Sequence, residues 1–268
     1  MHHAAAAAEL LAAGVDLLIE KPLAASLADA DRILELSRRF GRIVQTGHLE
    51  RFNPAVTAAR QYLNRPMFFE SHRLSVFTPR SLDVDVVLDL MIHDLDIVLS
   101  LVASAVREVR AVGLPVLSPK VDIANVRLEF ENGCIANFTA SRVSTERVRK
   151  LRFFQPHQYL SLDFARQDLL MIDVTAAAGL NMVQLAAMAA MVQAAGQHPT
   201  AGLSLKKLPV VEGEPLRLEI ESFLNAVRTR EKPLVSGDDG RAALALALEV
   251  NEAIAAHAER TGLSSIMR

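Results

Sequence analysis

The sequence predicts an α/β part followed by an α+β part: an incomplete Rossmann-type parallel sheet, then a domain with a mostly antiparallel sheet covered by helices. Near the N-terminus, helix and strand signals alternate with short connections, which is typical of a parallel, helix-covered sheet. From residue 106 onward, strand signals follow one another through short turns, which indicates antiparallel pairing. The length of 268 residues accommodates two domains, which we expect to span residues 1–66 and 67–268.

The first part of the chain carries clear signals for where its helices begin and end. Strong helix formers fill the start, and Gly14 stands where a helix commonly ends. Ser26, with Asp29 three positions later, is typical of a helix N-cap, and Gly41 is typical of the end of that helix. The elements expected in order are a helix over 3–13, a strand over 16–20, a helix over 26–40 and a strand over 43–46.

Strand signals dominate the second part. Glu131-Asn132-Gly133 predicts a tight hairpin turn of the primed type, because Asn and Gly tolerate positive φ angles. The single cysteine, Cys134, follows this turn and is expected to be a packed thiol in a reducing compartment. The expected elements are a helix over 55–63, a strand over 67–76, a helix over 88–102, strands over 106–116, 123–130, 134–141, 151–154, 159–163 and 169–174, and helices over 215–229 and 240–260.

The bulk composition argues against several classes of protein. Lys and Arg total 29 and Asp and Glu 31, a formal charge of −2, so the basic surface of a nucleic-acid-binding protein is not expected. The alanine-rich start lacks a basic region, unlike a signal peptide. A long uncharged stretch lies between Asp173 and Lys206, but its alanines contribute little to insertion, so no membrane span is expected. We interpret the stretch as a subunit contact, with membrane-surface contact as the alternative, in a cytoplasmic protein.

Glu20-Lys21-Pro22 follows the first predicted strand. Ligands bind at the carboxyl ends of strands in open α/β sheets, because the loops diverge there. A lysine at this place can donate a hydrogen bond to a substrate hydroxyl or to a cofactor amide. The alternative is a solvated turn that only leaves the strand.

Asp89 and His93 are one helical turn apart, so they share a face of the predicted helix. A carboxylate beside an imidazole fixes its tautomer and suits a general base that removes a hydroxyl proton. Asp96 leans toward the same side and is a weaker candidate. Two alternatives stay open: a helix start enriched in aspartates with an incidental histidine, or a metal site of Asp89, His93 and Asp96, which no further His/Asp cluster supports.

The segment from Gly47 to Pro54 follows the second predicted strand and carries His48 and Arg51, which are candidates to face the same cleft. A domain-linking turn is the alternative. Three further arginines are candidate contacts for a phosphorylated substrate, or else surface residues. They are Arg73, Arg80 and Arg142.

In this order, these segments resemble the Gfo/Idh/MocA oxidoreductase family. Its members show Glu-Lys-Pro after a strand of the nucleotide-binding fold, then a Gly-x-x-x-Arg-Phe-x-Pro-like segment, then Asp-x-x-x-His on a helix of the second domain. Here these are Glu20-Lys21-Pro22, Gly47 to Pro54, and Asp89 to His93. The resemblance covers nearly the whole chain, and the stretch 175–214 is the least typical.

The resemblance implies a sugar or nucleotide-sugar dehydrogenase that uses NAD or NADP and forms homo-oligomers through its antiparallel sheet. Lys21 and His93, supported by Asp89, would be catalytic. Within the family, the segments resemble those of enzymes acting on nucleotide-linked amino sugars, which suggests oxidation at C3 of UDP-N-acetylglucosamine. The implied cofactor contacts are Glu20, Lys21, Pro22, His48 and Arg51, and the expected substrate contacts are Lys21, Arg73, Arg80 and His93.

One departure from the family concerns the cofactor. The sequence contains no Gly-x-Gly-x-x-Gly motif, and such a loop normally binds the pyrophosphate at a helix N-terminus. We therefore expect a chain that corresponds to an N-terminally truncated family member, either because its reading frame begins further upstream or because it is a fragment. The alternative function is a non-catalytic ligand-binding or regulatory protein on the same fold.

Overall fold

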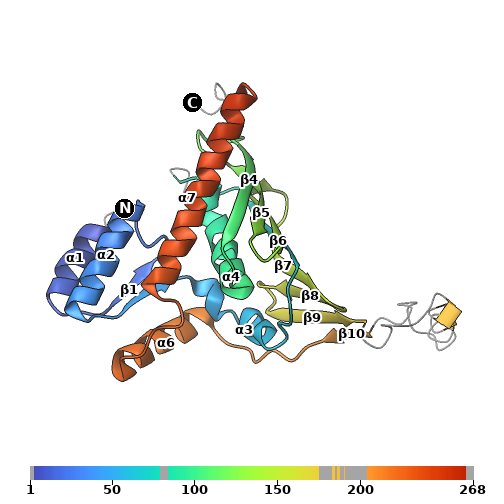
Figure 1. Cartoon of the computed structure of the whole chain (residues 1–268), viewed down its shortest axis with the longest axis horizontal. Coiled ribbons are helices and arrows are strands. Elements are labelled where there is room, and N and C mark those ends of the chain that lie inside the picture. The colour runs from blue at the N-terminus through green and yellow to red at the C-terminus, as the bar shows by residue number, and fades with distance from the viewer. Residues whose placement is uncertain are drawn as a thin grey trace.

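The computed structural model describes residues 3–78, 84–174, 183–184, 186–187, 190 and 204–263. It confirms the predicted fold class: a small parallel sheet of β1 and β2 precedes an eight-stranded sheet in the order β10-β9-β8-β7-β3-β6-β5-β4 (Figure 1). Arg80 and most of the uncharged stretch between Asp173 and Lys206 lie outside the described residues. Across the described ranges, no helix is long and apolar enough to cross a membrane.

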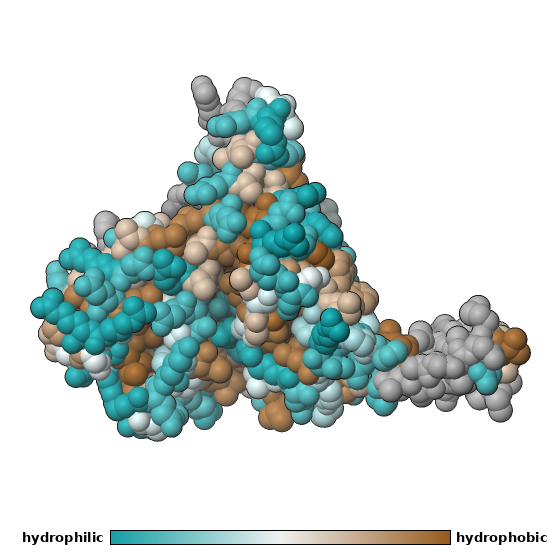
Figure 2. Space-filling view, viewed as in Figure 1, coloured by the Kyte–Doolittle hydropathy of each residue, from teal (hydrophilic) through white to brown (hydrophobic). Residues whose placement is uncertain are grey.

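The small sheet forms as its local signals predict. Its strands pair in parallel, with Leu17 opposite Val44. The Ser26 side chain caps the second helix by accepting from the Asp29 N–H, and Gly41 ends it in the left-handed conformation at φ 59°. The outer side of this helix is charged, and Figure 2 shows a mostly hydrophilic surface there. The bounds are α1 (His3–Ala12), β1 (Leu17–Glu20), α2 (Leu27–Phe40) and β2 (Val44–Gly47).

Two short helices lead into the large sheet, in which β3 and β6 run parallel and the other pairs are antiparallel. Along β3 and β5 buried and exposed residues alternate, so one face of the sheet lies on the core. The bounds are η1 (Leu49–Phe52, a 3-10 helix), α3 (Pro54–Arg60), β3 (Phe68–Val76), β4 (Val106–Leu114), β5 (Ile123–Phe130), β6 (Ile135–Ser144), β7 (Val148–Gln155), β8 (Gln158–Asp163), β9 (Asp168–Asp173) and β10 (Ser204–Lys207).

The hairpin between β5 and β6 corrects the predicted turn type. Gly133 alone in this turn has a positive φ, of 82°, and Asn132 does not. The Gly133 N–H bonds to the Phe130 carbonyl, and the Phe130 N–H bonds to the Cys134 carbonyl. This is a three-residue loop that ends in a left-handed glycine, so only the glycine needs conformational freedom. Cys134 is buried as predicted, and burial raises the pKa of its thiol to about 11.

The C-terminal helix α7 (Gly237–Arg260) joins the two parts of the molecule. Figure 1 shows it between the small and the large sheet. Leu244 lies in the core of the small sheet, whereas Val250 and Ile254 lie in the core of the large one. The helix begins at Gly237 with a capping box formed by Ser236, three residues before the predicted start. The preceding helix is α6 (Pro215–Thr229).

Close approach of α7 to β2 depends on Gly240. A Cβ at this position would overlap Thr46 Oγ1 and come within 2.7 Å of Thr46 Cβ. We expect Gly240→Ala to lower the free energy of unfolding by about 1–3 kcal/mol, since the packed helix must shift. Urea denaturation measures this change. Ala242→Ser, at an exposed position of the same helix, should change it by less than about 0.5 kcal/mol; equal effects would contradict the packing argument.

Candidate active site

Lys21 lies directly after β1, at the carboxyl end of the small sheet. The Lys21–Pro22 peptide bond is cis. The side chain is mostly buried, and its Nζ donates to the Asp89 carbonyl at 2.5 Å and lies 3.8 Å from Asp89 Oδ1. Burial lowers the pKa of Lys21, while the Asp89 carboxylate opposes this shift. Lys21 therefore connects the small sheet to the segment that carries Asp89.

Asp89 lies in a π-helical turn, η2 (Val87–Met91), which leads into α4 (Ile92–Val102). The sequence predicts one continuous α-helix here, with Asp89 directly one turn before His93. The wider π turn changes that stacking, and the Asp89 carboxylate lies by Lys21 and, at 4.0 Å, by Arg142 Nη2. Within the described residues, Nδ1 of His93 has no hydrogen-bond partner, so support of His93 by Asp89 stays a prediction.

His93 lies on α4 in surroundings that favour a neutral imidazole. Its side chain is partly exposed, while its Nδ1 is buried. Burial lowers the pKa of His93 well below its usual value, and the positive charges of Lys21 and Arg73 lower it further. The imidazole is therefore uncharged at neutral pH, which is the form that can accept a proton.

Arg73 from β3 is 3% exposed and is bound to two carboxylates. Its Nε and Nη2 donate to the two oxygens of Asp94, both at 2.8 Å, and its Nη1 donates to Glu50 Oε1 at 2.9 Å. Burial disfavours the charge, but Asp94 and Glu50 outweigh it and raise the pKa of Arg73. All three guanidinium nitrogens are thus engaged, so the geometry does not support the predicted direct contact of Arg73 with substrate.

The segment after β2 buries both of its candidate residues. His48 is 0% exposed, and its Nδ1 lies 4.0 Å from Asp96 Oδ2. Arg51 donates from Nη1 to the Asp96 carbonyl and from Nη2 to the Leu234 carbonyl, both at 3.4 Å. His48 and Arg51 are therefore buried behind the carboxyl end of the small sheet. The sequence predicts instead that they face the cleft.

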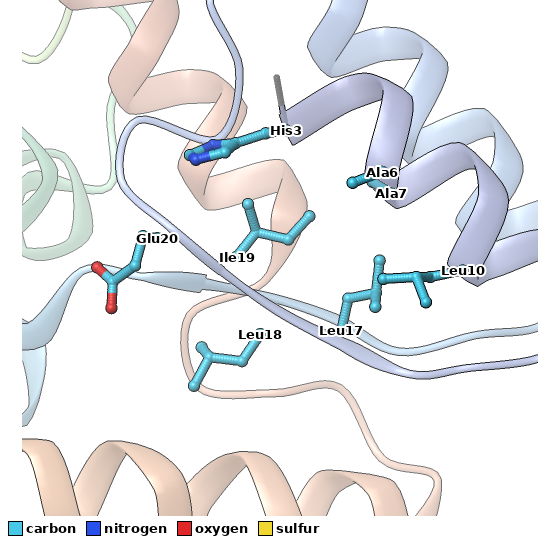
Figure 3. A pocket seen from close by; sticks show the side chains of 8 residues that line it. All are labelled: His3, Ala6, Ala7, Leu10, Leu17, Leu18, Ile19 and Glu20. Atoms are coloured by element: carbon cyan, nitrogen blue, oxygen red, sulfur yellow. The ribbon is translucent and has the colours of Figure 1, made fainter. Parts of the chain in front are cut away.

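Glu20 ends β1 and lines a pocket of about 270 Å³ between this strand and α1. Figure 3 shows the other lining side chains, which are mostly apolar and include Leu10, Leu17 and Ile19. A Cβ at position 47 would lie 2.9 Å from Glu20 Oε2, so a glycine there allows the carboxylate to approach β2. Glu20 therefore stands between this apolar pocket and the carboxyl ends of the strands.

Sequence reasoning misses Glu50 and Asp94, although one signal could have found them. Burial alternates along β3, which places Arg73 on the inward side of the strand. A buried guanidinium requires carboxylate partners. That requirement points to acidic residues on neighbouring elements, and Asp94 lies in the aspartate-rich run that also contains Asp89 and Asp96.

Comparison with known proteins places the chain among oxidoreductases. Residues 1–48 match the family model described as oxidoreductase family, NAD-binding Rossmann fold, and residues 41–155 match the GFO/IDH/MocA C-terminal domain. The chain is 35% identical over 260 residues to UDP-N-acetylglucosamine 3-dehydrogenase of Acidithiobacillus ferrooxidans. The match covers 96% of this chain and 77% of the relative. A solved structure of that enzyme, GnnA, superimposes with a TM-score of 0.83 at 32% identity, covering 100% of this chain and 77% of the other. Myo-inositol 2-dehydrogenase of Thermotoga maritima is 25% identical over 244 residues, 85% of this chain and 66% of the relative.

Removal of the Arg73 charge should destabilise the fold strongly. We expect Arg73→Ala to lower the free energy of unfolding by about 3–5 kcal/mol, because Asp94 is left buried and unpaired. Arg149→Ala is the matched control, since Arg149 also lies near Glu50, at 3.9 Å, but its side chain is 46% exposed; its effect should stay below about 1 kcal/mol. Chemical denaturation of both variants measures the difference, and similar losses would contradict the assignment.

Proposed function

Because the chain belongs to the Gfo/Idh/MocA family of oxidoreductases, we propose that it oxidises a secondary hydroxyl of a sugar or nucleotide sugar, with NAD or NADP as hydride acceptor. The observation that carries the proposal is the arrangement of Lys21, Asp89 and His93 at the carboxyl end of β1, where open parallel sheets bind ligands. In this proposal residues 1–66 contribute to cofactor binding, and residues 67–268 bind substrate and form the oligomer contact.

The residues at the ends of β1 and β2 suit the nicotinamide end of such a cofactor. The Lys21 side chain keeps 18% of its surface exposed there, and its ammonium group can donate to a cofactor amide. Glu20, Lys21 and Pro22 would hold this end, with His48 and Arg51 lying behind it. When bound, NAD or NADP supplies the ring carbon that takes up the hydride.

In this proposal His93 and Lys21 have different roles at the substrate oxygen. The neutral imidazole of His93 removes the hydroxyl proton as the hydride departs. Lys21 donates a hydrogen bond to the same oxygen and stabilises the negative charge that develops on it. Asp89 keeps the ammonium group in place through its carbonyl and carboxylate.

We propose UDP-N-acetylglucosamine, oxidised at C3, as the substrate. This is supported by the 35% identity to a UDP-N-acetylglucosamine 3-dehydrogenase, which extends over 96% of this chain. The test is incubation of the purified chain with UDP-N-acetylglucosamine and either NAD⁺ or NADP⁺. Reduced cofactor should accumulate, which absorbance measures. The product should be two mass units lighter than the substrate. Calorimetry that shows nucleotide-sugar binding without cofactor binding would instead favour the non-catalytic alternative.

The first variant to test is Lys21→Ala. We expect the turnover number to fall by roughly 10²- to 10³-fold, because a donor to the developing oxyanion is lost, while the unfolding transition is retained. Steady-state kinetics and circular dichroism measure the two effects. Lys232→Ala, at an exposed position, should leave turnover unchanged. Full activity of Lys21→Ala would remove Lys21 from the proposed site.

The outer face of the large sheet carries a row of apolar side chains, which we propose pairs two copies of the chain. Phe154 is 40% exposed, and its ring lies 5.6 Å from that of Phe68 and 4.9 Å from that of Tyr159. The strand register extends the row on both sides. Beside it, ion pairs such as Glu70–Arg152 offer both signs of charge to a second copy related by twofold rotation. The row consists of Leu205, Ile172, Tyr159, Phe154, Phe68 and Ile135.

A charge in the middle of this row should prevent the pairing. We expect Phe154→Arg to shift the protein to the monomer, because the arginine would be buried without a partner in the contact. Light scattering coupled to gel filtration measures the mass. Leu216→Arg is the control, since Leu216 is 46% exposed on α6, away from the sheet. An unchanged oligomer in Phe154→Arg would contradict the assignment of this face.

A further inference from the structure

A series of buried polar atoms leads from His93 to Asp96. The rings of His93 and His48 lie edge to face with centroids 6.4 Å apart, and Nδ1 of His48 lies 4.0 Å from Asp96 Oδ2. Among the described residues, Nδ1 of His93, both ring nitrogens of His48 and Oδ2 of Asp96 are buried without a hydrogen-bond partner. Such groups are rare in folded proteins, so four of them in one series require a physical reason.

The atoms of this series are of the right kinds to pass a proton. A neutral imidazole has one N–H donor and one acceptor nitrogen. Because Nδ1 of His48 lies 4.0 Å from Asp96 Oδ2, its Nε2 is the nitrogen left to accept from His93. His93 and Asp96 are three positions apart on α4 and so share one side of it, while His48 comes from the end of β2.

The surroundings of His48 and Asp96 determine which of the two holds a proton. Burial raises the pKa of Asp96 to about 7, although Arg51 opposes this. Burial lowers the pKa of His48 to about 3, and Arg51 adds to the effect. Near neutral pH, Asp96 is therefore the member of the pair that can hold a proton, and His48 stays neutral. The charged groups that act on the pair are Arg51, Lys21, Arg60 and Asp239.

We propose that His48 and Asp96 form a relay that carries away the proton that His93 removes from the substrate hydroxyl. The inference rests on the proposed dehydrogenase function. As the hydride leaves to the nicotinamide cofactor, the substrate O–H bond breaks and an N–H bond forms at Nε2 of His93. The Nδ1–H bond of His93 then breaks as one forms at Nε2 of His48, and the proton on Nδ1 of His48 moves to Asp96 Oδ2. Both imidazoles end neutral, and Asp96 ends as a carboxylic acid.

Asp96→Asn tests the acceptor, because an amide keeps the shape of the side chain but cannot take the proton. We expect kcat to fall roughly tenfold to a hundredfold with KM within about twofold of wild type, since proton transfer rather than binding is affected. Asp238→Asn is the control. It makes the same change at a carboxylate that is 60% exposed and pairs with Arg38 on the surface, outside the series, and it should leave kcat unchanged. An active wild type with an equally active Asp96→Asn would overturn the relay and leave the proposed function intact.

His48→Ala separates proton transfer from packing. We expect added imidazole to restore a large part of the lost kcat, because it has an acceptor and a donor nitrogen like the missing ring. N-methylimidazole fills the same space but cannot pass a proton, so it should restore none. Equal restoration by both compounds would show that His48 only fills space, and would overturn the relay.

A third measurement needs no turnover. In nitrogen NMR spectra of histidine-labelled protein, we expect the ring shifts of His48 to change with pH as Asp96 titrates, and to stay constant in Asp96→Asn. Constant shifts in the wild type would overturn the relay. If the wild-type chain shows no cofactor-dependent turnover, the proposed function fails, and this titration still decides whether His48 and Asp96 exchange a proton as a pair.

Discussion

Arg73 connects the elements that carry the proposed site. Its guanidinium is fixed between Asp94, the residue after His93, and Glu50, which lies two residues after His48. A buried arginine is tolerated only with carboxylate partners, and the loss of any member leaves an unpaired charge in the interior. The relative positions of the large sheet, α4 and η1 are thus set by ion pairs of defined geometry.

A second constraint acts from the opposite side of the site. Lys21 follows β1 of the small sheet and donates a hydrogen bond to the Asp89 carbonyl in the π turn. Its contact with η2 therefore depends on the backbone of the turn as well as on the charge of the Asp89 carboxylate. A π turn exposes carbonyls differently from an α-helix, and such turns recur at functional sites. With Lys21 on one side and Arg73 on the other, His93 lies on a helix that is fixed at both the start and the core-facing side.

Local signals in the sequence account for most of the secondary structure but for only part of the site. The caps at Ser26 and Gly41 and the place of Lys21 follow from residue type and spacing. The partner of Asp89 does not, because the π turn depends on tertiary contacts and has no local pattern of its own. The role of Arg73 cannot be predicted for a related reason, because its partners lie 21 and 23 residues away in the sequence. Strand alternation predicts that Arg73 is buried, but it does not identify the residues that pair with it.

The charges around His93 explain why a separate proton acceptor is useful. Lys21 and Arg73 lower the proton affinity of His93, which weakens it as a base, yet the positive charge of Lys21 also stabilises the alkoxide that forms when the hydroxyl loses its proton. Because the pKa of His93 is lowered, the protonated imidazole is a poor place to leave the proton. Asp96, also buried but with its proton affinity raised by that burial, is the better resting place. In the proposed relay, Lys21 favours the oxyanion while Asp96 holds the proton, and His48 lies between His93 and Asp96.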